Sequence, residues 1–243
     1  MINQFIIDLD RTTRLEIYSE FGTVMYVVMV ALFLYAVITK GIAFRNATVI
    51  FISFAVAFFM RPIIFGWIKQ MTNGLIASGN LGEAFLPFLA IFSLLLWICR
   101  VDILSGLDVA VPMYIGGRGA CIIGCIFPGC CHGQYAEWGI YSHHANYNTV
   151  PCPLIDSVLS FGIVTLIIWC SKKSSIRGKT TAYGMIAFGG LRYIIDVLRD
   201  NNKMFGLFTI EGISGFVCLC IGLIMLYILE RKVSANRKCC TLF

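Results

Sequence analysis

The stretch between Gly116 and Gly133 combines glycines, cysteines and one arginine, and it holds the residue types best suited to chemistry in this chain. Its single charge, Arg118, lies inside an otherwise uncharged run from residue 109 to residue 134. An arginine at membrane depth costs about 3 kcal/mol or more unless it has a partner or a water-filled cavity. The neighbouring glycines allow another group to approach the backbone closely. We therefore take Arg118 as a candidate binding residue rather than a side chain that reaches the membrane surface.

Three further charged residues lie near the end of a later apolar run. Arg192 and Asp196 are four residues apart and share one helical face, which Arg199 continues. An internal ion pair between Arg192 and Asp196 is one explanation. However, one aspartate cannot neutralise all the arginines of these apolar runs, which are Arg61, Arg118, Arg192 and Arg199. Guanidinium groups bind phosphate through paired hydrogen bonds, so the surplus predicts a phospholipid headgroup as the ligand.

The cysteines of the same stretch leave other chemistries open. Thiolates and an imidazole suit zinc or copper, and the possible ligands are Cys121, Cys125, Cys130, Cys131 and His132. Against a metal, the spacing lacks the usual separated Cys-x2-Cys pairs. Alternatively, Cys130 or Cys131 forms a disulfide with Cys121, Cys125 or Cys152 on the outer side of a membrane.

The composition indicates an integral membrane protein. Hydrophobic residues make up 58% of the 243 residues and charged residues 13%, and the mean hydropathy is +0.83. Soluble domains carry about 25% charged residues. No basic groove with interleaved aromatic residues is visible, so nucleic acid is not an expected partner. We expect an all-α polytopic protein that uses membrane lipids and needs no cofactor.

Apolar runs long enough to cross a bilayer predict about seven transmembrane helices in one integral membrane domain over residues 1–243. The expected spans are residues 21–39, 47–64, 84–99, 109–127, 154–170, 182–198 and 207–229. Residues 1–18 read as a surface amphipathic segment, residues 128–153 as a long loop and residues 230–243 as a basic tail. Seven spans divide the loop Lys and Arg into eleven on one side and six on the other. This bias predicts the N-terminus and the 128–153 loop outside, and the C-terminus in the cytoplasm.

Several stretches, in order along the chain, resemble the prolipoprotein diacylglyceryl transferase family. Residues 21–26 (Phe-Gly-Thr-Val-Met-Tyr) are similar to its Tyr-Gly-x-x-Met-Tyr, and residues 117–121 (Gly-Arg-Gly-Ala-Cys) to the start of its Gly-Arg-x-Gly-Asn/Cys signature. Residues 129–133 (Gly-Cys-Cys-His-Gly) resemble the Gly-Cys-Cys-Tyr-Gly of Cys-rich members. Residues 151–156 resemble Pro-x-Gln-Leu-Tyr-Glu, and residues 188–199 resemble Tyr-Gly-x-x-Arg-Phe-x-x-Glu-Phe-x-Arg.

The chain also departs from the family pattern. The family's His-Gly-Gly motif belongs near residues 80–90, where residues 80–84 read Asn-Leu-Gly-Glu-Ala. Cys121 stands at the signature's Asn position, Val150 replaces a His, and about four extra residues separate Arg118 from the Cys-Cys pair.

The resemblance implies transfer of diacylglycerol from phosphatidylglycerol to the lipobox Cys thiol of a lipoprotein precursor, in the plasma membrane of a bacterium. It implies a phosphate site around Arg118 and Arg192, and the remaining substrate-binding candidates are Arg199, Arg61, Gly117 and Gly133. In this reading Tyr26 donates a hydrogen bond, Asp196 orients Arg192, and His132 replaces the missing base. His143, His144 and Glu83 are further candidates for the base. The alternatives are a Cys/His metal-binding or redox-active membrane protein, and a lipid-binding relative without transferase activity.

Overall fold

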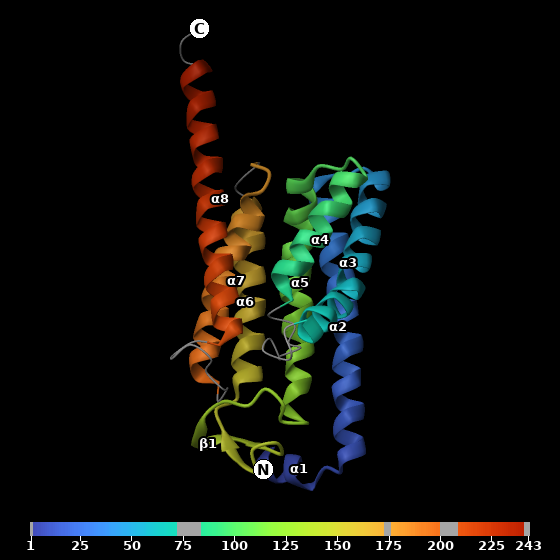
Figure 1. Cartoon of the computed structure of the whole chain (residues 1–243), viewed down its shortest axis with the longest axis vertical. Helices are drawn as coiled ribbons and strands as arrows, with labels where there is room; N and C mark the ends of the chain where they lie inside the picture. The colour runs from blue at the N-terminus through green and yellow to red at the C-terminus, as the bar shows by residue number, and fades with distance from the viewer. Residues whose placement is uncertain (1, 72–83, 173–175, 200–208, 241–243) are drawn as a thin grey trace.

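The computed structural model describes residues 2–71, 84–172, 176–199 and 209–240, and the statements below concern these residues. The described chain is mostly helical. Its helices are α1 (Ile2–Asp8), α2 (Arg11–Lys40), α3 (Phe44–Met71), α4 (Phe85–Ile98), α5 (Ile103–Ile123) with the short 3-10 helix η1 (Gly124–Ile126), α6 (Cys152–Lys172), α7 (Lys179–Leu198) and α8 (Ile210–Cys240). The long helices run along one common axis, and the two chain ends lie at opposite ends of the bundle (Figure 1).

Helix α5 is the centre of the bundle. Nearly every residue from Gly106 to Ile122 is buried, and α5 contacts α2, α6 and α7, while α7 packs along α8. Glycines allow this close packing: a Cβ on Gly116 would lie 2.5 Å from a methyl group of Leu32 in α2. The Gly-rich sequence around Arg118 therefore brings several helices close to this arginine.

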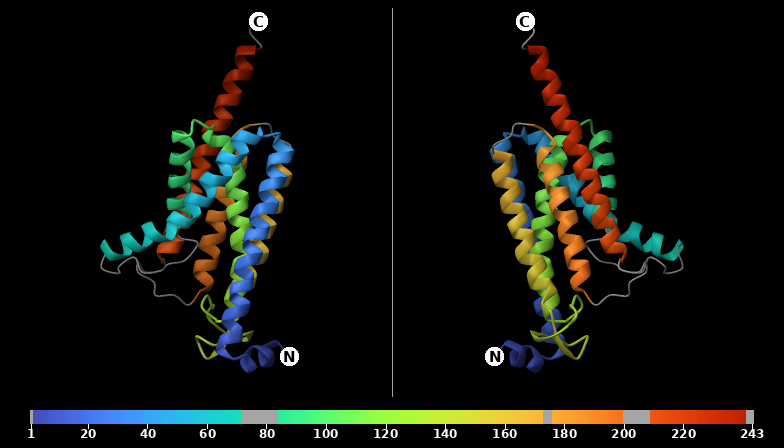
Figure 2. Two further views of the ribbon diagram at one scale, coloured as in Figure 1. Left: turned by 90° about the vertical axis from the view of Figure 1, so that its right-hand side faces the viewer. Right: turned by 90° about the vertical axis from the view of Figure 1, so that its left-hand side faces the viewer.

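Five described helices are long and apolar enough to cross a membrane, which supports part of the seven-span prediction. They are α2, α3, α5 with η1, α6 and α8. The other two expected spans correspond to α4, which has only 14 residues, and α7, whose apolar run contains Arg192 and Asp196. Helix α3 contains Pro62, a residue that kinks helices, and its last turns point away from the bundle axis (Figure 2).

The long loop expected at residues 128–153 contains a β-hairpin, so the all-α prediction missed one element. Strand β1 (Tyr135–Ser142) pairs antiparallel with β2 (Tyr147–Thr149), in a register that places Tyr141 opposite Asn148. The register shifts between Tyr135 and Ile140, and burial along β1 does not alternate strictly. The sequence therefore lacks the clean two-residue period by which a strand is recognised.

The N-terminal segment also differs from the single surface segment expected over residues 1–18. It divides at Asp10, whose carboxylate caps the N-terminus of α2 by accepting from Thr12 N at 3.0 Å. Helix α1 packs on the hairpin: Tyr141 N donates to Asn3 Oδ1 at 3.1 Å, and Ile6 is buried. Helix α1 and the hairpin therefore form one cap over the same end of the bundle (Figure 1).

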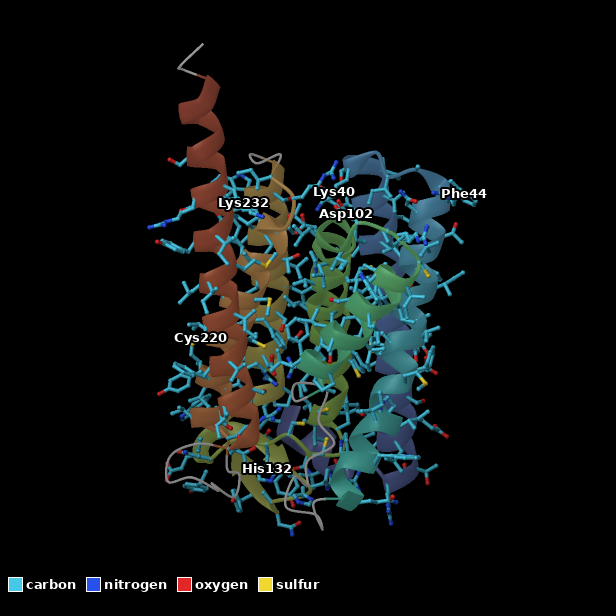
Figure 3. All side chains as sticks on the ribbon, turned by 45° about the horizontal axis from the view of Figure 1, so that its top comes forward. Lys40, Phe44, Asp102, His132, Cys220 and Lys232 are labelled. Atoms are coloured by element: carbon cyan, nitrogen blue, oxygen red, sulfur yellow. The ribbon has the colours of Figure 1, made fainter. Side chains whose placement is uncertain are left out.

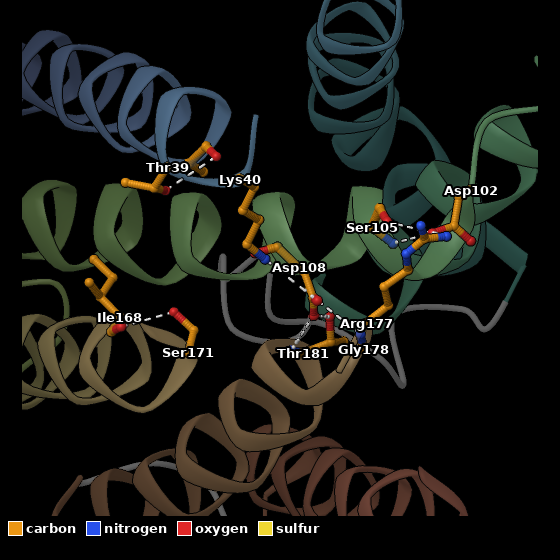
Figure 4. Close-up of polar contacts among 11 residues, drawn as sticks. Thr39, Lys40, Asp102, Ser105, Asp108, Ile168, Ser171, Arg177, Gly178 and Thr181 are labelled. Atoms are coloured by element: carbon orange, nitrogen blue, oxygen red, sulfur yellow. Dashed lines mark hydrogen bonds and ion pairs between the residues drawn. The ribbon is translucent and has the colours of Figure 1, made fainter. Parts of the chain in front are cut away.

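A buried aspartate joins α5 to the start of α7 at the opposite end of the bundle. Asp108 accepts from Gly178 N at 2.8 Å, from Thr181 N at 2.8 Å and from the Thr181 hydroxyl at 2.7 Å (Figure 4). Lys40 Nζ lies 3.5 Å from the same carboxylate. These bonds satisfy amide groups that a helix N-terminus leaves without an intrahelical partner. Asp108 therefore acts as the N-terminal cap of α7, supplied from another helix.

We expect Asp108→Asn to lower the free energy of unfolding by about 1–3 kcal/mol, because an amide cannot accept all these bonds and its NH2 group faces donors. Thermal unfolding followed by circular dichroism in detergent measures the loss. Asp102→Asn is the matched control, because Asp102 is exposed, bonds with Ser105 in the first turn of α5 and pairs only with the exposed side chain of Arg177, at 3.7 Å. Equal melting temperatures for Asp108→Asn and wild type would contradict the capping role.

Candidate functional site: a buried arginine pair on one carboxylate

Three helices bring two arginines onto one aspartate inside the bundle. Arg118 of α5 makes two hydrogen bonds to Asp156 of α6, from Nη1 to Oδ1 at 2.6 Å and from Nη2 to Oδ2 at 2.7 Å. Arg192 of α7 donates from Nη2 to the same Oδ2 at 2.6 Å. All three side chains are at most 2% exposed. The two guanidinium groups therefore lie side by side and are held by a shared carboxylate.

One aromatic ring lies against both arginines. The ring centroid of Phe188 is 5.7 Å from Cζ of Arg118 and 5.8 Å from Cζ of Arg192. Cations within about 6 Å of an aromatic centroid are attracted to the face of the ring. Phe188 is itself fixed by Phe85 of α4, at 4.7 Å between ring centroids. The ring therefore limits where the two guanidinium groups can move.

Small residues allow α5 to approach α6, and α8 to approach α7, at this level. A Cβ on Gly119 would lie 2.9 Å from Cβ of Ser160 in α6, and one on Gly215 of α8 would lie 2.7 Å from Cβ of Arg192. Ser160 also donates from its hydroxyl to Oδ1 of Asp156 at 3.4 Å. The glycines next to the charged residues thus set the distances between helices that the ion pairs require.

The carboxylate that holds Arg192 is Asp156, whereas the sequence suggested Asp196. The structure places the Asp196 carboxylate on Thr209, accepting from its backbone N at 3.1 Å and from its hydroxyl. Thr209 directly precedes α8, so Asp196 connects the end of α7 to the start of α8. Among the described side chains, Asp156 and Asp196 offset two of the three buried arginine charges, so the surplus there is one positive charge.

Arg199 and Gly133 meet at the junction between α7 and the hairpin. They form an isolated antiparallel bridge, Gln134 N donates to Leu198 O at 3.1 Å, and Arg199 is buried. A Cβ on Gly133 would lie 2.7 Å from both Val150 O and Sγ of Cys152, so no larger residue fits here. The predicted binding residues Arg199 and Gly133 are therefore close together and adjacent to the end of α7.

The other predicted site residues lie outside the arginine pair. Tyr26 is about half exposed, and its ring packs edge-on against Phe58. His132 lies in the turn after η1, with Nδ1 3.2 Å from Gly133 O and its ring 5.6 Å from that of His144. Gly117 faces Met29 of α2. None of the described contacts joins these residues to Asp156.

The remaining histidine and the other proposed bases have different positions. His143 Nε2 lies 2.7 Å from Ile6 O, so this ring contacts α1 and is only partly solvated. Arg61 is in α3, and its side chain is outside the described part of the chain. Residues 80–83, including Glu83, also lie outside the described residues.

Three of the turn cysteines gather at the end of α5. The Sγ atoms of Cys125, Cys130 and Cys131 all lie within 4.8 Å of one another, and the three residues are unbridged thiols. Hydrogen bonds from the Cys125 and Cys130 thiols, together with the charges of Arg199 and Arg118, lower the pKa of Cys131 to about 2. The disulfides considered from the sequence are thus not formed by these three residues, and Cys131 is stabilised as a thiolate.

Asp156 is the site residue that the sequence reasoning missed. It closes the stretch 151–156, which was matched to a family motif ending in Glu, but no role was assigned to it. The available signal was an aspartate in the first turns of an apolar span, which needs a positive partner as much as Arg118 needs a negative one.

The fold and this site define a class: a polytopic helical membrane protein with an arginine–carboxylate cluster buried near one end of its bundle. A family model for prolipoprotein diacylglyceryl transferase matches residues 31–228, which is most of the chain. The chain therefore belongs to the prolipoprotein diacylglyceryl transferase family, which confirms the resemblance found in the sequence.

Two curated relatives are similar to parts of the chain. A phosphatidylglycerol–prolipoprotein diacylglyceryl transferase of Clostridium tetani is 26% identical over 125 residues, which cover 49% of this chain and 49% of the relative. Phosphatidylglycerol–prolipoprotein diacylglyceryl transferase 2 of Clostridium perfringens is 27% identical over 180 residues, which cover 68% of this chain and 70% of the relative. The chain thus spans about half the length of the first relative and about two thirds of the second.

Proposed function

We propose that this protein transfers the diacylglyceryl group of phosphatidylglycerol to a cysteine thiol of a lipobox-containing prolipoprotein. The observation that carries the proposal is the convergence of Arg118 and Arg192 on Asp156, which places two guanidinium groups side by side. Membership of the family and the names of the two relatives support the same reaction. The arrangement provides adjacent cationic donors for one phosphodiester group.

In the reaction, the acceptor thiolate attacks the diacylglycerol carbon that carries the phosphate. The new S–C bond forms as the C–O bond breaks, and glycerol phosphate leaves with the electron pair. Arg118 and Arg192 bind the phosphate and stabilise the charge that gathers on it. Asp156 holds both guanidinium groups in place before substrate arrives, which avoids their reorganisation during the reaction.

The remaining candidates take supporting roles in this proposal. Arg199 and Arg61 add positive charge, Gly117 and Gly133 allow close approach, Tyr26 donates to a substrate oxygen, and His132 accepts the thiol proton. Asp196 acts by fixing the end of α7, which carries Arg192.

We also propose that the chain crosses a bacterial plasma membrane seven times, as one domain with the N-terminus outside. Helices α4 and α7 run alongside the five longer apolar helices, which supports seven crossings (Figure 1). Lys40, Asp102 and Lys232 then lie toward the cytoplasmic end, and His132 lies at the outer end (Figure 3). The hairpin region within residues 128–153 faces outward, and the basic segment 230–243 faces the cytoplasm.

Transfer of labelled diacylglycerol from phosphatidylglycerol to a lipobox peptide, measured in membranes, tests the proposal. We expect Arg118→Ala and Arg192→Ala each to lower the rate by about 100-fold or more, because each removes a donor to the developing charge. Arg177→Ala is the control, because Arg177 is exposed and pairs with Asp102 at the opposite end of the bundle (Figure 4). Wild-type rates in both site variants would refute the phosphate-binding role.

A further inference from the structure

The cysteine cluster lies beside the proposed phosphate site but has no role in it so far. Cys125 is buried in η1, while Cys130 and Cys131 follow in the turn that leads to the hairpin. Arg199 forms a bridge with Gly133, two residues after Cys131, and Arg118 lies in α5, which η1 with Cys125 directly follows. The cluster and the arginine pair therefore belong to one continuous region at the end of α5.

The spacing of the three sulfurs fits a common metal ion. Zinc–thiolate bonds of about 2.3 Å in a tetrahedral arrangement place two sulfurs about 3.8 Å apart. Sγ of Cys130 and Sγ of Cys131 are 3.9 Å apart, and all three sulfurs lie within 4.8 Å. A disulfide would require about 2.05 Å. The adjacent residues Cys130 and Cys131 thus already have a sulfur separation suited to one shared ion.

The surroundings of the cluster suit a charged complex with a further ligand. Three thiolates and a divalent ion carry one net negative charge, and the buried Arg199, bridged to Gly133 two residues after Cys131, supplies a positive charge beside them. A cavity of about 20 Å³, lined in part by Cys125 and His132, adjoins the cluster. Such a volume accommodates about one water-sized group. Cys121 and His132, the other two metal ligands expected from the sequence, do not belong to the group of described residues whose ligand atoms lie within 4.8 Å of one another.

We propose that Cys125, Cys130 and Cys131 bind one zinc-type divalent ion, and that its fourth position receives the thiol of the acceptor cysteine. Three protein ligands with one open position are typical of catalytic rather than structural zinc. A coordinated thiol loses its proton outright, so the ion activates the acceptor thiol and His132 takes up the proton that it releases. This role rests on the proposed diacylglyceryl transfer.

The step balances without an oxidant or a reductant. The acceptor thiol releases its proton to His132, which lines the adjoining cavity, as its sulfur binds the ion. The bound sulfur then donates an electron pair to the diacylglycerol carbon, so the S–C bond forms and the C–O bond to phosphate breaks. Glycerol phosphate takes the electron pair of that bond, and the thioether, a much weaker ligand than a thiolate, leaves the ion.

Metal analysis of the full chain purified in detergent is the first measurement. We expect about one zinc per chain, and a reduction of about tenfold or more in Cys130→Ser and in Cys131→Ser after dialysis. Cys220→Ser is the matched control, because Cys220 lies in α8, distant from His132 and the cluster turn (Figure 3). A monodisperse elution profile for each variant shows that it has folded. Absence of zinc, or equal zinc in the Cys130→Ser, Cys131→Ser and wild-type proteins, overturns the site.

Cobalt substitution tests the fourth position without relying on activity. We expect the visible spectrum of the Co²⁺-loaded protein to change when a lipobox peptide is added, and to stay unchanged with the same peptide carrying serine in place of cysteine. An unchanged spectrum with the cysteine peptide overturns the role in binding the acceptor. Transfer by metal-free protein also overturns the inference, while leaving the proposed function intact. A metal-loaded protein that binds the cysteine peptide but never transfers diacylglycerol contradicts the proposed function instead.

Discussion

Asp156→Asn is expected to lower the free energy of unfolding by about 3–5 kcal/mol, because it leaves two buried guanidinium groups without their shared charge partner. Asp156 is fully buried and accepts three hydrogen bonds at 2.6–2.7 Å from Arg118 and Arg192. A neutral amide keeps only one acceptor oxygen, and its NH2 group meets other donors. Thermal unfolding in detergent should show this loss, and the transfer rate should fall as in the arginine variants.

Asp156→Glu separates charge from geometry. The carboxylate is retained with one extra methylene, so we expect the protein to fold and to keep part of its transfer rate. The family motif that residues 151–156 resemble ends in Glu, which is consistent with this expectation. If Asp156→Asn unfolds at the same temperature as wild type, the two arginines do not depend on this carboxylate, and the proposed preorganisation of the phosphate site is wrong.

The helical framework could be predicted from sequence because burial in a membrane leaves long apolar runs. The expected span 154–170 corresponds to α6 at Cys152–Lys172, and the expected span 182–198 to α7 at Lys179–Leu198. Helix α2 begins ten residues before the expected span 21–39, because Arg11, Arg14 and the acidic residues near them form a polar but helical start of α2. Hydropathy detects the apolar part of a helix, and the cap at Asp10 marks its beginning.

The arrangement of the site was less predictable, because it depends on packing between helices. Arg118 and Arg192 were identified from the cost of charge in an apolar run, which one sequence reveals. The partner of Arg192 was not identified, because helical spacing pointed to Asp196. The carboxylate that Arg192 contacts belongs to Asp156, which lies on a different helix. Nor could the sulfur cluster be predicted, since Cys125 and Cys131 meet only after η1 and the turn reverse the chain.

The extra residues between Arg118 and the cysteine pair have a simple structural meaning. They are expected within residues 122–128, where α5 ends at Ile123 and η1 and a turn follow. The added length therefore lies between the helix that carries Arg118 and the turn that carries the cysteine pair. Arg118 itself lies inside α5 and binds Asp156, and the cysteine cluster lies beyond the end of that helix.

Gly189→Ala is expected to separate α7 from α8 and to displace Arg192. A Cβ on Gly189 would lie 2.5 Å from Gly215 O and 2.7 Å from Leu219 N, which are backbone atoms of α8 that a rotamer change cannot move. Overpacking of this kind costs about 1–3 kcal/mol, more than the gain of about 1 kcal/mol that alanine gives over glycine inside a helix. Arg192 lies less than one turn away, so we also expect at least a tenfold loss of the transfer rate, since a misplacement of about 1 Å can cost 100-fold.

Gly190→Ala is a control of matched chemistry at the next position of the same helix. In the described part of the chain, nothing beyond its chain neighbours and the nearby backbone of α7 lies within 4 Å of the Cβ that it would add, so only the helix propensity changes. We expect its melting temperature to equal or exceed that of wild type, with an unchanged transfer rate. The contrast isolates backbone contact between α7 and α8 from any general effect of alanine in α7. If Gly189→Ala melts and transfers like Gly190→Ala, the close approach of α8 does not determine where Arg192 lies, and Asp156 and Phe188 alone must hold it in place.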